Sequence, residues 1–145
     1  MSGRHYPAIT ELVPHRASML LIDKLLECDQ DGGRALHEVA PNAWYIERGG
    51  MPAWIGLELM AQTIAAFVGF NKRLDGLPPT QGYLLGTRRL RCAVCAFPVG
   101  ARLEIVAKRL YQEDTGLAAF ECEIVLDGAG VAHATLTVFE PHADN

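Results

Sequence analysis

The feature that most constrains this chain is an apolar segment from Pro52 to Phe70 that carries a single charged residue, Glu58. Gly49 and Gly50 precede the segment, and a proline in its first position is typical of a helix start. Apolar residues lie on all sides of such a helix, so it must be buried, either in a membrane or inside a protein. The fold therefore has to supply a cover for nearly the whole helix.

The choice between membrane and protein core depends on the polar residues of this segment. Its nineteen residues would span about 28 Å, which is enough to cross a bilayer. Glu58 and Gln62 argue against that interpretation, because a charge in the middle of a helix is expensive in lipid. The segments that follow alternate polar and apolar residues, as half-buried strands do. We therefore predict an α+β arrangement, in which a curved antiparallel sheet wraps one central helix.

Breaks rich in Gly, Pro and Asp divide the rest of the chain into short segments. We expect a short helix at Ile9–Val13. The expected strands cover Met19–Cys28, Arg34–Ala40, Tyr83–Cys95, Ala101–Gln112, Leu117–Leu126 and Val131–Phe139. In two of them alternation predicts the inward faces, which are Leu103, Ile105, Ala107 and Arg109, and then Phe120, Cys122, Ile124 and Leu126. The length of 145 residues predicts a single domain over residues 1–145.

Composition excludes several classes of function. Half of the residues are hydrophobic, which is incompatible with a disordered chain. The 13 Lys and Arg residues are outnumbered by 17 Asp and Glu residues, giving a net charge of −4. This balance argues against a nucleic-acid binder. The first residues lack the apolar run of a secretory signal, so we expect a cytoplasmic protein.

The four cysteines include one closely spaced pair, Cys92 and Cys95. A zinc ribbon needs a second such pair, and a redox pair opens a helix, whereas this one lies at the end of an expected strand. We therefore expect free thiols, with Cys92 packed in the core and Cys95 ending the strand. We expect neither a metal nor a cofactor.

Glu58 is the candidate catalytic residue. Burial in an apolar helix disfavours an ionised carboxyl, and a carboxyl held near neutrality suits general acid–base chemistry. Gln62 lies four residues on and can orient it. The helix start, with Ala53, Trp54 and Gly56, is a candidate site for binding a carbonyl group through backbone N–H groups and the helix dipole. The alternative is a structural glutamate paired at a subunit contact.

Three stretches of the chain, in order, resemble the hot-dog-fold 3-hydroxyacyl-acyl carrier protein dehydratases of fatty acid synthesis. They are Val13-Pro14-His15-Arg16 with Met19–Lys24, the run GMPAWIGLELMAQ from Gly50 to Gln62, and Gly82–Arg91 with Phe97-Pro98-Val99-Gly100. The sequence is more similar still to the divergent dehydratase-like proteins of aryl-polyene pigment clusters, through PHR, PAWxGxExMAQ, LLGTRR and the terminal VFEP. The resemblance implies a hot-dog fold, a dimer and an acyl thioester substrate.

One departure from the family pattern concerns the base. The dehydratases carry a catalytic His in the loop before the central helix, and the corresponding loop, Ala43–Gly50, contains none. Trp44 stands about where that His would be, and His37 is the nearest alternative. The resemblance places the active site at a dimer interface, with His and acid from different subunits. A homodimer, or a heterodimer with a His-bearing dehydratase, is therefore expected.

Three functions remain open on these grounds. The first is a 3-hydroxyacyl-acyl carrier protein dehydratase that uses Glu58 and takes its base from a partner. The second is a hot-dog thioesterase that uses Glu58 on carrier-protein or CoA thioesters, and the third is a non-catalytic acyl-binding partner subunit. Arg88, Arg89 and Arg91 are candidate contacts for an acidic acyl carrier protein, or a solvated sheet face. Trp44, Tyr45 and Trp54 are expected either to line an acyl tunnel or to pack in the core.

Overall fold

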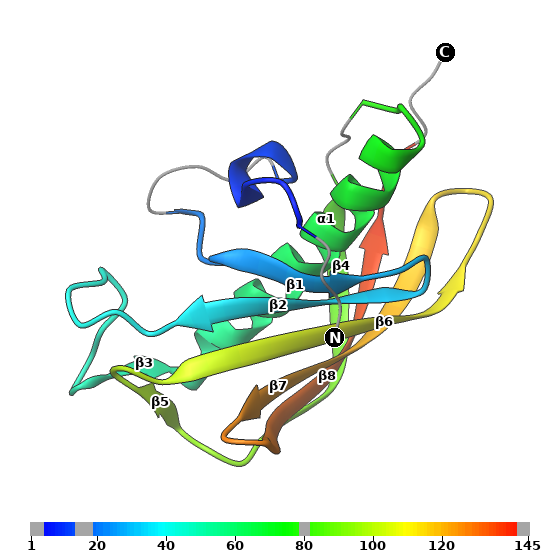
Figure 1. Cartoon of the computed structure of the whole chain (residues 1–145). Helices are drawn as coiled ribbons and strands as arrows, with labels where there is room; N and C mark the ends of the chain where they lie inside the picture. The colour runs from blue at the N-terminus through cyan, green and yellow to red at the C-terminus, as the bar shows by residue number, and fades with distance from the viewer. Residues whose placement is uncertain (1–4, 14–18, 79–81, 142–145) are drawn as a thin grey trace.

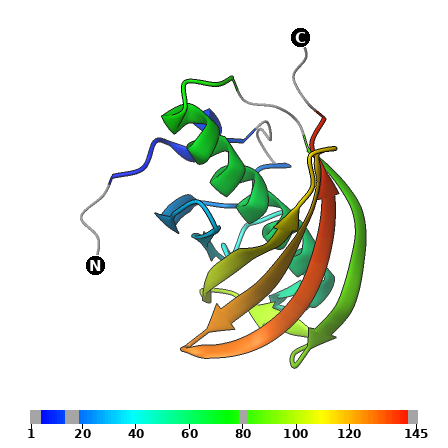
Figure 2. The same ribbon diagram turned by 90° about the vertical axis from the view of Figure 1, so that its right-hand side faces the viewer.

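The computed structural model describes residues 5–13, 19–78 and 82–141. The PHR run therefore lies mostly outside the described residues. One long helix, α1 (Gly56–Leu74), follows a 3₁₀ turn, η3 (Ala53–Ile55), and a second 3₁₀ turn, η1 (Ile9–Glu11), lies near the N-terminus. Figure 1 shows these elements against the sheet, and Figure 2 shows α1 lying along its concave side.

Every strand pair in the structure is antiparallel, as expected for a hot-dog fold. The main sheet has the order β1-β2-β6-β7-β8-β4. Its strands are β1 (Lys24–Cys28), β2 (Gly32–Glu38), β6 (Arg102–Gln112), β7 (Leu117–Leu126), β8 (Ala129–Phe139) and β4 (Tyr83–Cys92). A separate small pair is formed by β3 (Gly50–Pro52) and β5 (Ala96–Pro98). The predicted hot-dog architecture is confirmed.

The central helix begins and ends later than the sequence suggests. Met51 and Pro52 are used by β3, where they pair with Phe97 and Ala96, so the α-helix begins only at Gly56. At the other end it continues past Phe70 to Leu74. It stops where Gly76 takes a φ of 72° and donates its N–H to the Arg73 carbonyl, which is a common helix ending.

The helix is the core of the fold. The span Ala53–Leu74 is long and apolar enough for a membrane, and 61% of its most apolar window is buried inside the protein. The Phe67 side chain is fully buried and packs edge-on against Phe120 of β7, with 5.8 Å between ring centroids. Gly69 lets the helix approach the N-terminal segment closely, since a Cβ there would lie 2.2 Å from the Leu12 carbonyl oxygen.

The predicted alternation of β6 and β7 is confirmed, whereas β4 has no buried face. Leu103, Ile105 and Ala107 are buried on β6, and Phe120, Cys122 and Ile124 are buried on β7. On β4 nearly every residue is exposed, including Leu84 and Leu90. A bulge between Arg88 and Arg91, with Arg89 at a φ of 56°, adds one residue to the strand and breaks its alternation.

Cys92 corrects a second expectation. It is exposed at the end of this edge strand instead of packed in the core, as is Cys95, whereas Cys122 is fully buried. The strand lies at the edge of the sheet, where it pairs with β8 alone.

The thiols should therefore differ sharply in reactivity. Burial raises the pKa of the Cys122 thiol to about 12, and the thiolate is the reactive form. In dilute native protein we expect Ellman's reagent to modify Cys92 and Cys95 and to spare Cys122 until the chain is unfolded. Peptide mapping of the modified chain gives the order, and fast modification of Cys122 in native protein would contradict the burial.

Candidate active site

Glu58 lies in the first turn of α1, half-buried, with its carboxylate held by a neighbour on the same helical face. The Gln62 side chain donates from Nε2 to Glu58 Oε2 at 2.9 Å. The predicted spacing of four residues thus produces the expected contact. Glu58 also lines an apolar cavity, so the carboxyl is fixed at a place that a small molecule can reach.

Gln62 does more than orient Glu58. It is fully buried, and its Oε1 accepts from the backbone N–H groups of Leu21 (2.8 Å) and Ile22 (3.2 Å). Its Nε2 also donates to the Met19 carbonyl at 2.7 Å. One amide therefore ties the segment before β1 to the helix and to the carboxylate. Sequence reasoning missed this role, because the partners lie some 40 residues earlier.

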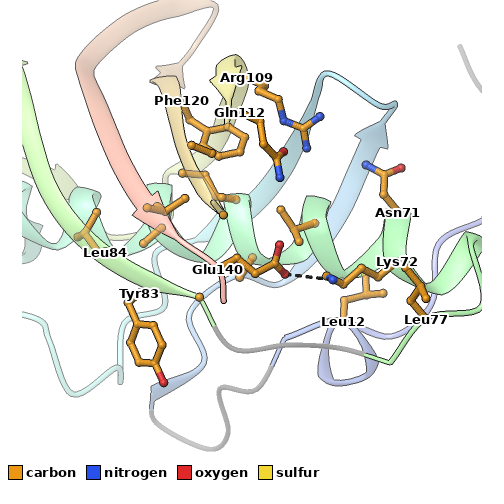
Figure 3. Close-up of a pocket in the computed structure, with 18 of the residues that line it drawn as sticks. Leu12, Asn71, Lys72, Leu77, Tyr83, Leu84, Arg109, Gln112, Phe120 and Glu140 are labelled. Atoms are coloured by element: carbon orange, nitrogen blue, oxygen red, sulfur yellow. Dashed lines mark ion pairs between the residues drawn. The ribbon is translucent and has the colours of Figure 1, made fainter. Parts of the chain in front are cut away.

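The cavity beside Glu58 runs along α1 and has a volume of about 430 Å³. This is within the usual range for small-molecule sites. Helix α1 and strands β4, β6, β7 and β8 line it, together with Leu12 and Leu77 (Figure 3). Its lining residues on α1 are Glu58, Ala61, Ile64, Ala65, Val68, Asn71 and Lys72, and Asp75 follows directly after the helix. Their spacing of three and four residues places them on one helical face. This spacing is visible in the sequence, but an all-apolar helix does not reveal which of its faces lines a cavity.

Not all of the backbone N–H groups expected to bind a carbonyl at the helix start are available for it. The N–H of Ala53 donates to the Cys95 carbonyl at 3.0 Å, and that of Gly56 donates back into the 3₁₀ turn. Gly56 is buried, and a Cβ there would lie 2.8 Å from Ile124 Cδ1, so close packing explains the glycine. Trp54, between them, is 65% exposed.

The three aromatic residues of the predicted site separate in the structure. Tyr45 is buried, while Trp44 is exposed, and the two rings meet edge-on at 5.6 Å. Trp44 and Trp54 therefore present large apolar surfaces outward instead of filling the core of the chain. Single exposed aromatic residues of this kind are favoured at protein interfaces.

His37 is enclosed by the fold. Its Nδ1 lies 2.5 Å from the Leu21 carbonyl and its Nε2 lies 2.7 Å from the Tyr45 hydroxyl. Burial raises the pKa of Tyr45, so the phenol keeps its proton. The carbonyl can only accept, so Nδ1 carries the proton and Tyr45 donates to Nε2. Both nitrogens are thus occupied, and His37 is a structural residue in this arrangement.

The three candidate carrier contacts, Arg88, Arg89 and Arg91, lie on the exposed edge strand β4 around its bulge. This strand contains no acidic residue. It also exposes Tyr83, Leu84, Leu85 and Leu90 by 46–59%. The edge is thus apolar and basic together, unlike a merely solvated face.

Comparison with known families gives one match over most of the chain. The model of a family described as ApeP-like, ApeP dehydratase, matches residues 7–145.

Solved structures agree with this match. The dehydratase heterocomplex ApeI:P from Xenorhabdus doucetiae is 26% identical to this chain with a TM-score of 0.90, covering 96% of this chain and 94% of that one. A hypothetical thioesterase with coenzyme A from Streptococcus pneumoniae is 15% identical with a TM-score of 0.64, covering 84% and 88%. A mutant of the phenylacetic acid degradation protein PaaI from Thermus thermophilus is 21% identical with a TM-score of 0.61, covering 80% and 90%. The last two likenesses show the shared fold alone.

Proposed function

Because the chain belongs to the ApeP-like dehydratase family, we propose that it is the glutamate-bearing subunit of a dehydratase acting on 3-hydroxyacyl thioesters. A second hot-dog chain supplies the base. The observation that carries the proposal is the Glu58 carboxylate, held by the buried Gln62 amide at the side of an apolar cavity. An acid fixed beside an acyl-sized cavity is what this reaction requires.

The chemistry divides between the two chains. A base from the partner removes the C2 proton, the electron pair forms the C2–C3 double bond, and the C3–O bond breaks. Glu58, protonated before the step, gives its proton to the departing oxygen, so the products are an enoyl thioester and water. The N–H groups of the 3₁₀ turn at Trp54 and Ile55, at the positive end of α1, polarise the thioester carbonyl.

Two of the described histidines, His37 and His133, are already hydrogen-bonded within this chain, which supports a base from outside it. His37 is committed to Leu21 and Tyr45. His133 lies on the exposed face of β8 and pairs with Glu123 at 2.8 Å. Trp44 occupies the loop in which the resembled family carries its base. The structural relative is named as a heterocomplex, which is consistent with a base delivered by a different chain.

The β4 edge is the surface we propose for pairing. A row of exposed leucines on an unpaired edge is a liability for a lone chain, and pairing with another strand removes it. Such pairing would also bring Trp54 and the Glu58 end of the cavity near the second chain. The same strand in a homodimer would place its three arginines opposite their own copies, which favours a less basic partner. Arg88, Arg89 and Arg91 remain proposed contacts for an acyl carrier protein where pairing leaves them accessible.

Light scattering tests the pairing directly. We expect this chain and the ApeI component of the Xenorhabdus doucetiae heterocomplex to form a one-to-one complex. Replacing Leu85 and Leu90 by Lys on this chain should abolish it without unfolding the chain, since both side chains are exposed and neither lines the cavity. The matched control is Leu110→Lys, which is equally exposed on β6. Equal complex formation by all three proteins would overturn the proposed pairing surface.

A further inference from the structure

The cavity beside Glu58 has charged side chains at its far end. On α1 it is lined by Glu58, then by apolar residues that include the small Ala61 and Ala65, and then by Asn71 and Lys72. At 1.5 Å per residue, Lys72 lies about 21 Å along the helix from Glu58. The two alanines leave room beside the helix for a chain of methylene groups. We call this run the acyl groove.

The middle of the acyl groove is apolar on its other side as well. Leu84 of β4, Ala118 and Phe120 of β7 and Val138 of β8 face the helix across it. Figure 3 labels Leu84 and Phe120 among the side chains drawn beside α1. Arg109 of β6 is charged and also lines this stretch, but its guanidinium lies over the Phe120 ring, 5.8 Å from the centroid, and donates from Nη1 to the Gln30 carbonyl at 2.7 Å. The side chains named above are apolar, so an acyl chain extending from the thioester end fits between them.

At the far end an ion pair joins the helix to the sheet. Lys72 Nζ lies 3.4 Å from Glu140 Oε2, and the two side chains are only 22% and 20% exposed. Glu140 is held in place through its backbone N–H, which donates to the Gly116 carbonyl at 2.9 Å. In Figure 3 the pair crosses from α1 to the end of β8, with Leu12 and Leu77 beside it. An alkyl chain that reached the pair would have to strip water from both charges without offering a hydrogen bond.

We propose that the Lys72–Glu140 ion pair closes the acyl groove and sets the longest acyl chain that this protein accepts. This inference rests on the proposed function in one respect, which is that the acyl groove binds the acyl chain of the substrate. The two residues determine specificity and take no part in the proton transfers at Glu58, which lies near the other end.

The test measures binding, which does not require catalysis. Non-hydrolysable acyl-pantetheine amides of increasing chain length are titrated into the full-length chain by calorimetry. Each buried methylene is expected to raise affinity by up to about fourfold, until the chain reaches the ion pair, and to lower it beyond that length. In Lys72→Ala and Glu140→Ala the rise should continue to longer chains. The reversed pair Lys72→Glu with Glu140→Lys should restore the wild-type limit.

A neighbouring ion pair provides the matched control. Arg73 Nη1 and Glu11 Oε1 lie 2.9 Å apart, one residue further along α1, and neither residue lines the cavity. Arg73→Ala should leave the chain-length limit unchanged. The proposal is overturned if wild type shows no limit, if the limit is the same in both alanine variants, or if Arg73→Ala shifts it equally.

A separate assay keeps this result distinct from the proposed function. One outcome is that the paired complex dehydrates short 3-hydroxyacyl thioesters while Lys72→Ala leaves the longest bound acyl chain unchanged. That result would contradict the role of the ion pair and support the proposed function. If the alanine variants shift the chain-length limit but the paired complex dehydrates no substrate, the proposed dehydratase function is wrong. The role of the ion pair in limiting acyl-chain length is then still supported.

Discussion

Replacing Glu58 by Gln is expected to lower the dehydration rate of the paired complex by about 10²–10⁴-fold, the usual contribution of one general acid or base. The substitution keeps the size of the side chain and removes its exchangeable carboxyl proton. An amide oxygen can still accept from Gln62 Nε2, which donates to Glu58 at 2.9 Å in the native chain. Loss of activity would therefore reflect the missing acid instead of a displaced helix. Mass spectrometry of the enoyl thioester formed from a 3-hydroxyacyl carrier protein gives the rate.

A second acid near the proposed site is the matched control. Glu47 lies in the loop before β3, exposed to solvent, with its backbone N–H bonded to the Gly50 carbonyl. Glu47→Gln makes the same chemical change at a position outside the cavity lining. It should leave the rate unchanged.

Two outcomes would contradict the division of labour. Full activity in Glu58→Gln would remove Glu58 from the mechanism. Fast dehydration by the wild-type chain without a partner would show that this chain contains its own base, and His37→Gln would then identify or exclude the buried histidine.

The hot-dog fold was predictable because its strongest signals are periodic. A helix that is apolar on all sides has to be buried, and the alternation of β6 and β7 predicts a sheet with an apolar face that can bury it. The short strands β3 and β5 were not predicted, since three residues each are too few to show a period. Their pairing is also what delays the start of α1 to Gly56.

The expected burial of Cys92 on the edge strand β4 was wrong for a different reason. Alternation indicates which side chains share a face, but a bulge adds a residue without any compositional mark, and Arg89 in a positive-φ conformation is not a typical signal. An edge also lacks the cover that makes an inward face buried. Cys92 was therefore placed in the core by a rule that holds only for covered strands.

The site was half predictable. The contact between Glu58 and Gln62 follows from helical spacing alone. The remaining contacts of Gln62, and the meeting of Lys72 with Glu140, join residues that are distant in sequence, so only the folded chain brings them together.

Gln62→Leu should be among the most damaging single substitutions in the chain. It leaves the N–H groups of Leu21 and Ile22 and the Met19 carbonyl without the amide that satisfies them. Each buried group orphaned in this way costs roughly 1–3 kcal/mol, because leucine fills the space but offers no hydrogen bond. Urea unfolding of the variant should give a midpoint well below that of wild type.

Activity and stability should fall together in this variant, because one side chain serves both. Thr63→Val is the matched control. Thr63 is equally buried on the same helix, but its Oγ1 donates only to the Leu59 carbonyl, one turn earlier. Loss of this hydroxyl should change the midpoint of urea unfolding little. Gln62→Glu separates the two roles, since it retains an acceptor for Leu21 and Ile22 while placing a second carboxyl beside Glu58. If that variant unfolds like wild type and still dehydrates at the wild-type rate, the amide does not position Glu58.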